Sequence, residues 1–125
     1  MNIHKITVNA SVAYDVIIGK NLLDNCSEYI KNVVKATCFA LITDDNVNTL
    51  YADMVTKSLT SCGFTVCKFV FPHGEASKCS DTLNQIYDFL SANHITRSDC
   101  IIALGGGVVG DITGFAAATY LRGID

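Results

Sequence analysis

The segment CIIALGGGVVGDITGFAAATYLRG, residues 100–123, indicates the fold most directly. Its first five residues are apolar, which is typical of a strand that is buried on both faces of a parallel sheet. Three glycines at 105–107 end this strand, and the small, mostly apolar residues after them predict a helix that ends near Arg122 and Gly123. A strand, a glycine turn and a helix in this order form the phosphate-binding unit of many α/β proteins.

The rest of the chain alternates between strands and helices in the same way. Apolar runs at 38–43 and 64–71 predict two more strands. Residues 3–9 and 13–18 alternate between apolar and polar side chains, which predicts two short strands in a hairpin. Helices are predicted at 21–34, 46–62 and 80–94, where apolar residues recur every three or four positions. This order predicts an α/β domain with a Rossmann-like, mostly parallel sheet and helices on both faces.

The composition is that of one globular domain. The chain has 125 residues, of which 50% are hydrophobic and 17% charged, and this is enough for a hydrophobic core. Its net charge of -3 and its scattered Lys and Arg residues argue against a nucleic-acid partner. No stretch is apolar over the roughly 20 residues of a membrane span, and the first residues do not resemble a secretory signal. We therefore expect a cytoplasmic protein without membrane association.

Nucleophiles and metal ligands are scattered along the chain. Six cysteines occur without a CxxC pair, so we expect free thiols that pack as small hydrophobic groups. The three histidines, His4, His73 and His94, show no metal-ligand spacing. No Ser-His-Asp or Cys-His arrangement stands out. We expect neither a metal ligand nor a catalytic residue within this chain.

The glycine turn is the strongest candidate site. Gly105, Gly107 and Gly110 satisfy the GxGxxG pattern, in which glycine allows a phosphate to approach the backbone and the helix N-terminus faces the anion. A tight structural turn is the alternative. Asp111 is expected in the first turn of the helix, where it either stabilises the helix dipole or accepts hydrogen bonds from a ribose or a nicotinamide.

Two other polar loops follow predicted strands. In PHGEASK, residues 72–78, Glu75 and Lys78 form either an ordinary surface ion pair or part of a ligand site in which the acid binds a ribose hydroxyl. TDDN, residues 43–46, caps a helix or joins the same site. Because the carboxyl ends of parallel strands meet at one edge of a sheet, we expect all three loops to share one crevice.

Arg122 lies near the end of the last predicted helix. A cation there stabilises the helix dipole, and the alternative function is a clamp on a phosphate or a carboxylate. These residues alone leave both interpretations open.

Three blocks together resemble one enzyme family. LITDDNV, PHGEASK and GGGVVGDITGFAAATYLRG, in this order and covering most of the chain, resemble 3-dehydroquinate synthases, which belong to the sugar phosphate cyclases. The resemblance implies that residues 1–125 are an N-terminal nucleotide-binding domain, the first third of a two-domain enzyme. A largely helical C-terminal domain, with the metal and most of the substrate residues, would lie beyond Asp125.

The resemblance also implies an activity for the full-length parent. That enzyme belongs to the shikimate pathway of aromatic amino acid biosynthesis. It converts 3-deoxy-D-arabino-heptulosonate 7-phosphate, a phosphorylated sugar acid, to 3-dehydroquinate and phosphate. It uses NAD catalytically, requires a divalent metal, zinc or cobalt, and forms homodimers. The present chain alone is expected to be inactive.

Site residues follow from the resemblance position by position. The implied NAD contacts are Asp44, Asn46, Glu75, Lys78, Gly106, Gly107, Val108 and Asp111. Arg122 is implied to contact the substrate, through its phosphate. No catalytic residue and no metal ligand is implied within the chain.

The residues of this chain leave two other functions of the same fold open. One is a related sugar phosphate cyclase, or more distantly a glycerol or iron-dependent dehydrogenase, because the residues that distinguish them would lie beyond Asp125. The other is a nucleotide-binding module without catalytic activity.

Overall fold

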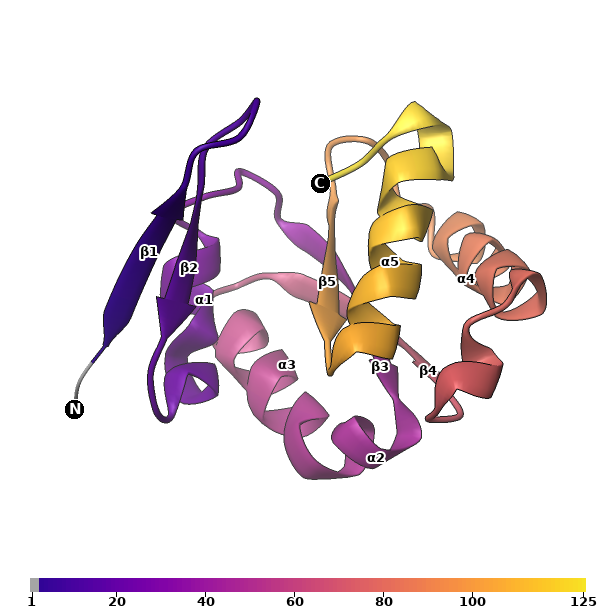
Figure 1. Cartoon of the computed structure of the whole chain (residues 1–125), viewed down its shortest axis with the longest axis horizontal. Coiled ribbons are helices and arrows are strands. Elements are labelled where there is room, and N and C mark those ends of the chain that lie inside the picture. The colour runs from indigo at the N-terminus through magenta and orange to yellow at the C-terminus, as the bar shows by residue number, and fades with distance from the viewer. Residues whose placement is uncertain (1–2) are drawn as a thin grey trace.

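The computed structural model describes residues 3–125, which form a central parallel sheet covered by helices and a separate hairpin (Figure 1). The strands are β1 (His4–Val8), β2 (Tyr14–Ile18), β3 (Cys38–Asp44), β4 (Thr65–Phe71) and β5 (Cys100–Leu104). The helices are α1 (Cys26–Ile30), α2 (Asp45–Val47), α3 (Asp53–Ser61), α4 (Ser80–Ala92) and α5 (Gly107–Thr119). All five predicted strands are confirmed, as is the α/β class.

The sheet has the order β4-β3-β5, and both outer strands run parallel to β3. The hairpin of β1 and β2 is antiparallel and forms a sheet of its own. Strand β3 is central, and its residues Phe39 to Thr43 are fully buried. This burial explains why the segment is a continuous apolar run, since both faces of a central parallel strand are covered.

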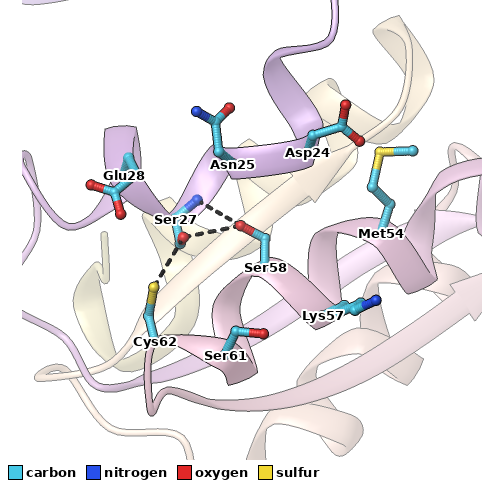
Figure 2. A pocket seen from close by; sticks show the side chains of 9 residues that line it. All are labelled: Asp24, Asn25, Ser27, Glu28, Met54, Lys57, Ser58, Ser61 and Cys62. Atoms are coloured by element: carbon cyan, nitrogen blue, oxygen red, sulfur yellow. Dashed lines mark hydrogen bonds between the residues drawn. The ribbon is translucent and has the colours of Figure 1, made fainter.

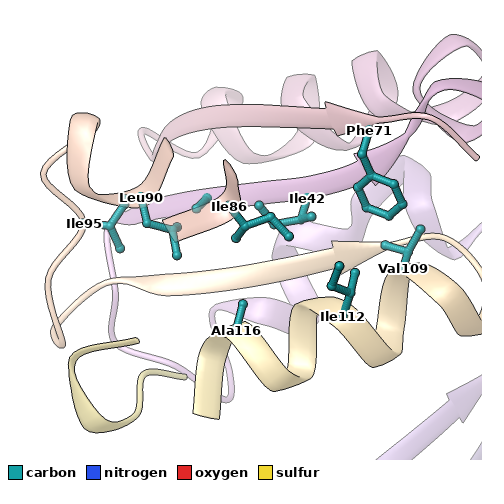
Figure 3. Close-up of a cluster of buried hydrophobic side chains, with 9 residues drawn as sticks. Ile42, Phe71, Ile86, Leu90, Ile95, Val109, Ile112 and Ala116 are labelled. Carbon is teal, nitrogen blue, oxygen red and sulfur yellow. The ribbon is translucent and has the colours of Figure 1, made fainter. Parts of the chain in front are cut away.

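Helices cover both faces of the sheet, as predicted. On one face, Ala40 and Ile42 of β3 pack with α4 and α5 in the core cluster of Figure 3. On the other face, Phe39 and Leu41 pack with α1 and α3. Neighbouring residues of β3 therefore belong to opposite layers, as the alternation of side chains along a strand requires.

The helix predicted at 21–34 is shorter in the structure. A 3-10 turn at Leu22–Asn25 precedes α1, which ends at Ile30. Asn25 has a non-helical backbone, so the two pieces do not join into one helix. Val33, which the apolar pattern includes, is 78% exposed, whereas Ile30 and Val34 of the same stripe pack against the core.

The helical segment after β3 ends where the sequence predicts. A π-helical turn at Asn48–Ala52 joins α2 to α3. Gly63 then has a φ of +86°, and its N–H donates to Thr60 O while Phe64 N–H donates to Leu59 O. These two bonds form the glycine-dependent stop known as the Schellman motif.

After β3 and after β5 the chain continues on opposite faces of the sheet. After β3 it enters the helices of one face, and after β5 it enters α5 on the other face (Figure 1). Such a divergence between neighbouring parallel strands creates the ligand crevice of open α/β sheets. In residues 3–125 no helix is long and apolar enough to cross a membrane.

Candidate functional site

Three loops start at neighbouring points of one sheet edge. Asp44 at the end of β3 pairs with Phe71 at the end of β4, and Thr43 pairs with Leu104 at the end of β5. The buried Thr43 hydroxyl donates to Leu104 O at 2.7 Å, which ties the ends of β3 and β5 together. The polar residues after these strands therefore share the carboxyl edge, as expected.

The first loop is held by its own aspartates. Asp44 is extended, and its Oδ1 accepts a hydrogen bond from Val47 N–H at 2.8 Å, so its predicted role as a helix cap is confirmed. Asp45 Oδ1 accepts from Asn46 N–H at 2.9 Å. The side chain of Asn46 is exposed at the same edge.

The second loop carries an ion pair that the sequence pattern misassigned. Lys78 Nζ lies 2.7 Å from Asp111 Oδ2 on α5, so the surface pair considered for Lys78 and Glu75 is replaced by a bond from this loop to α5. The hydrogen bond to Asp111 raises the pKa of the Lys78 ammonium above its usual value, with a smaller contribution from Glu75. Glu75 begins a 3-10 turn that ends at Ser77.

The glycine turn leaves the N-terminus of α5 uncapped. Helix α5 starts at Gly107, and Gly106 before it has no side chain to accept from the first N–H groups. A Cβ placed at Gly106 or Gly107 would meet no atom within 4 Å, so the turn is open. The side chain of Val108 is half-buried against the core. These free donors are what an anion binds at a helix N-terminus.

Asp111 differs from its predicted place. It is the fifth residue of α5, and the first turn of this helix carries no acid. Its interpretation as a dipole-stabilising residue of the first turn is therefore wrong, because the dipole effect falls off within that turn. Its carboxylate instead reaches Lys78 in the neighbouring loop.

Arg122 lies at the opposite edge of the sheet. Helix α5 runs back along the sheet, and the chain after it returns to the start of β5, where Ile101 N–H donates to Asp125 O at 2.7 Å. Gly123 O accepts from Arg97 Nε at 3.3 Å in the loop before β5. The structure therefore gathers the other predicted site residues at the carboxyl edge and separates Arg122 from them.

One feature of the edge escaped the sequence analysis. His73 and Asp45, on two different loops, are joined by two hydrogen bonds to the same carboxylate oxygen. The hydrogen bond from the His73 side chain is the main reason why the pKa of Asp45 lies below its usual value. The sequence feature that could have predicted this contact is a histidine after one strand and an acid after the neighbouring strand.

Two of the hollows in the surface bear on the candidate site and on its surroundings. One of about 250 Å³ adjoins the Lys78–Asp111 pair and is lined also by Cys79, Leu83, Ile112 and Phe115. The other, of about 500 Å³, lies between α1 and α3 (Figure 2).

The second hollow contains a polar contact between helices. Ser58 Oγ–H donates to Ser27 Oγ at 3.0 Å, and Cys62 Sγ–H donates to the same oxygen at 3.2 Å. Since both serines are buried, these bonds satisfy polar groups of the packed helices. None of the residues lining this hollow belongs to the three loops.

The free thiols should differ strongly in reactivity. All six cysteines are free, and Cys62 and Cys79 are exposed whereas Cys26 and Cys100 are buried. Burial raises the pKa of Cys100 to about 11, while hydrogen bonds from the side chain and backbone of Thr82 lower the pKa of Cys79. Because the thiolate is the reacting form, a maleimide at pH 7 is expected to label Cys79 first and Cys100 only after unfolding. Peptide mass spectrometry over time measures this order, and equal rates for these two thiols in the folded chain would contradict it.

The sequence comparisons match this chain to 3-dehydroquinate synthases. Residues 68–125 match the family model described as 3-dehydroquinate synthase N-terminal. The 3-dehydroquinate synthase of Streptococcus suis is 51% identical over 121 residues, which are 96% of this chain and 34% of that protein. That of Streptococcus thermophilus is 51% identical over 111 residues, 89% of this chain and 31% of that protein. The chain spans about a third of the length of the curated relatives it matches.

The comparison of folds gives a consistent result. A 2-deoxy-scyllo-inosose synthase superposes with a TM-score of 0.85 at 23% identity, over 97% of this chain and 34% of that one. ValA, a 2-epi-5-epi-valiolone synthase from Streptomyces hygroscopicus solved with NAD+ and Zn2+ bound, has a TM-score of 0.76 at 26% identity, over 95% and 32%. The fold is thus that of the N-terminal part of sugar phosphate cyclases. Within this class, the chain belongs to the 3-dehydroquinate synthase family.

Proposed function

We propose that this chain is the NAD-binding domain of a 3-dehydroquinate synthase. The complete enzyme would convert 3-deoxy-D-arabino-heptulosonate 7-phosphate to 3-dehydroquinate and phosphate, in the cytoplasm and as a homodimer. The names of the relatives support the reaction. A 2-deoxy-scyllo-inosose synthase of the same fold, with a TM-score of 0.82 at 22% identity over 97% of this chain and 33% of that one, was solved with carbaglucose-6-phosphate, NAD+ and Co2+. That complex supports a phosphorylated sugar as the partner, and the sugar acid is part of the proposal.

The observation that carries the proposal is the set of groups at the carboxyl edge. The uncapped N–H groups at Gly106, Gly107 and Val108 suit the two phosphates of NAD, because they combine free donors with the positive end of a 13-residue helix. The open space at both glycines lets the phosphates approach the backbone. Bound NAD supplies reversible hydride transfer.

The other residues would fix the ends of the cofactor. The carboxylates of Asp44 and Glu75 are acceptors for ribose hydroxyls, and the Asn46 amide can donate or accept. Lys78 brings a positive charge to the edge, held there by its bond to Asp111. The apolar wall of the hollow beside this pair, formed by Leu83 and Phe115, can pack against a planar ring.

A metal is not assigned to this chain. Within residues 3–125 no group of three or more His, Cys, Asp or Glu side chains is placed to hold an ion. We propose that residues 1–125 act as the N-terminal nucleotide-binding domain. The zinc or cobalt site, with the catalytic residues, would lie in the part of the relatives that this chain does not match. Arg122 is proposed to contact the substrate phosphate, and its position requires that this contact be made away from the NAD edge.

The proposal is tested by calorimetric titration of the purified chain with NAD. We expect saturable binding, and we expect the double variant Glu75→Ala/Asp111→Ala to bind at least about a hundredfold more weakly. Glu75→Ala removes a charged acceptor for NAD, and Asp111→Ala removes the carboxylate that holds Lys78 at the edge. Two hydrogen bonds to charged groups are worth about 3 kcal/mol or more together.

A matched double variant controls for the loss of two negative charges. Glu28→Ala/Asp99→Ala removes one glutamate and one aspartate outside the three loops, and it should bind NAD as the unmodified chain does. Glu28 pairs with Lys31 on the α1 side, and Asp99 accepts from Thr96 N–H before β5. Equal weakening in both double variants, or no binding to the unmodified chain, would contradict the proposed site.

A further inference from the structure

The Asp45 carboxylate connects two of the three loops through one oxygen. Asp45 Oδ1 lies 3.0 Å from His73 N and 2.7 Å from His73 Nδ1. The same oxygen accepts from Asn46 N–H at 2.9 Å. Three donors from two loops therefore converge on a single acceptor atom.

The bonds between Asp45 and His73 lie just beyond the last paired residues of β3 and β4. The β3–β4 ladder ends with Asp44 opposite Phe71. Beyond this point His73 and Asp45 provide two direct hydrogen bonds from loop to loop. The ladder itself does not set the distance between the residues that follow it.

Both residues lie next to the proposed NAD contacts. Asp45 stands between Asp44 and Asn46, and His73 stands two residues before Glu75. Gly74, between His73 and Glu75, has a φ of +101°, a conformation that glycine adopts without strain. The loop can therefore turn sharply directly after the bonded histidine.

The pair is suited to a local role rather than to stabilising the whole domain. The side chains of His73 and Asp45 are 58% and 50% exposed. Exposed ion pairs contribute little to global stability because water and salt screen them. They can still select one arrangement of two loops, because backbone N–H donors fix direction as well as distance.

We propose that Asp45 and His73 are positioning residues that hold the loops after β3 and β4 in a fixed relation. By this means Asp44 and Asn46 on one loop and Glu75 on the other meet the same ligand. The part of the inference that concerns affinity rests on the proposed NAD function.

The first test is a double-mutant cycle on NAD affinity. Asp45→Ala, which removes both hydrogen bonds, and His73→Ala, which removes the side-chain one, are each expected to weaken NAD binding about five- to tenfold. The double variant should bind no more weakly than Asp45→Ala, because that substitution already breaks the whole connection. His73→Asn should recover most of the affinity, since an asparagine amide can donate from a position near that of Nδ1. Asp99→Ala, which removes an aspartate that accepts a backbone N–H at the opposite edge, should have no effect.

A second measurement does not depend on NAD. Amide hydrogen exchange of the full chain is expected to be at least about tenfold faster at His73 N–H in Asp45→Ala, with the exchange of β3 and β4 unchanged. If the unmodified chain fails to bind NAD, the proposed function fails, and exchange alone then decides the positioning role. Unchanged exchange at His73, normal NAD affinity of the single variants, or additive losses in the double variant would each overturn the inference.

Discussion

Replacement of Phe71 by alanine is expected to lower the free energy of unfolding by about 3–5 kcal/mol, the usual cost of removing a buried aromatic side chain. Phe71 is only 2% exposed and belongs to the core cluster on the α4 and α5 face. Figure 3 shows its ring near Val109 and Ile112 of α5. The alanine variant would leave a cavity between β4 and α5, since a packed core relaxes only partly.

Urea unfolding followed by circular dichroism measures this loss. Phe71→Leu, which keeps most of the volume, should cost clearly less than the alanine variant. Phe115→Ala is the matched control, because Phe115 is 57% exposed on α5 and should change stability by less than about 0.5 kcal/mol. If Phe71→Ala were no more destabilising than Phe115→Ala, the assigned core would be wrong.

Replacement of Gly105 by alanine is expected to destabilise the chain by about 1–3 kcal/mol through overpacking. A Cβ at this position would lie 2.6 Å from Cγ2 and 2.9 Å from Cβ of Val109. Val109 is 1% exposed and is packed in the core, so it cannot move aside freely. The start of α5 would have to shift away from β5, and with it the N–H groups proposed to bind NAD.

Gly114→Ala separates this steric effect from the general effect of removing a glycine. A Cβ at Gly114 would meet no atom within 4 Å, and the residue lies in the interior of α5. Alanine there should stabilise the helix by up to about 1 kcal/mol, the difference in helix propensity. Thermal unfolding of both variants measures the contrast, and a loss of stability in Gly114→Ala as large as that in Gly105→Ala would refute the steric explanation.

Local patterns predicted the strands more reliably than the first helix. The runs at 38–43 and 100–104 agree with β3 and β5 because a strand buried on both faces must be apolar throughout. The helix predicted at 21–34 was too long, since an apolar stripe shows which residues can face a core but does not fix the backbone between them, and Asn25 is non-helical. Val33 continues the stripe and is nevertheless exposed.

The same distinction applies to the candidate site. The strand ends, the glycine turn and the membership of the 3-dehydroquinate synthase family were visible in the order of residues, because each depends on a short continuous motif. Which residues touch across loops was not visible. From the sequence, Glu75 was the acid expected beside Lys78, since it lies three residues away. Asp111 is its partner only because α5 packs against the sheet and brings the two side chains together.

By itself, the sequence determined an α/β domain with a parallel sheet, three polar loops at one edge and an uncapped glycine turn before the last helix. Only the tertiary structure decided that Arg122 lies at the opposite edge, that Asp111 bonds to Lys78, and that His73 and Asp45 join two loops. The physical reason is the distance along the chain over which each effect acts. Propensity, capping and burial patterns act over a few neighbouring residues, whereas these contacts depend on the register of β3 with β4 and on the direction of α5 along the sheet.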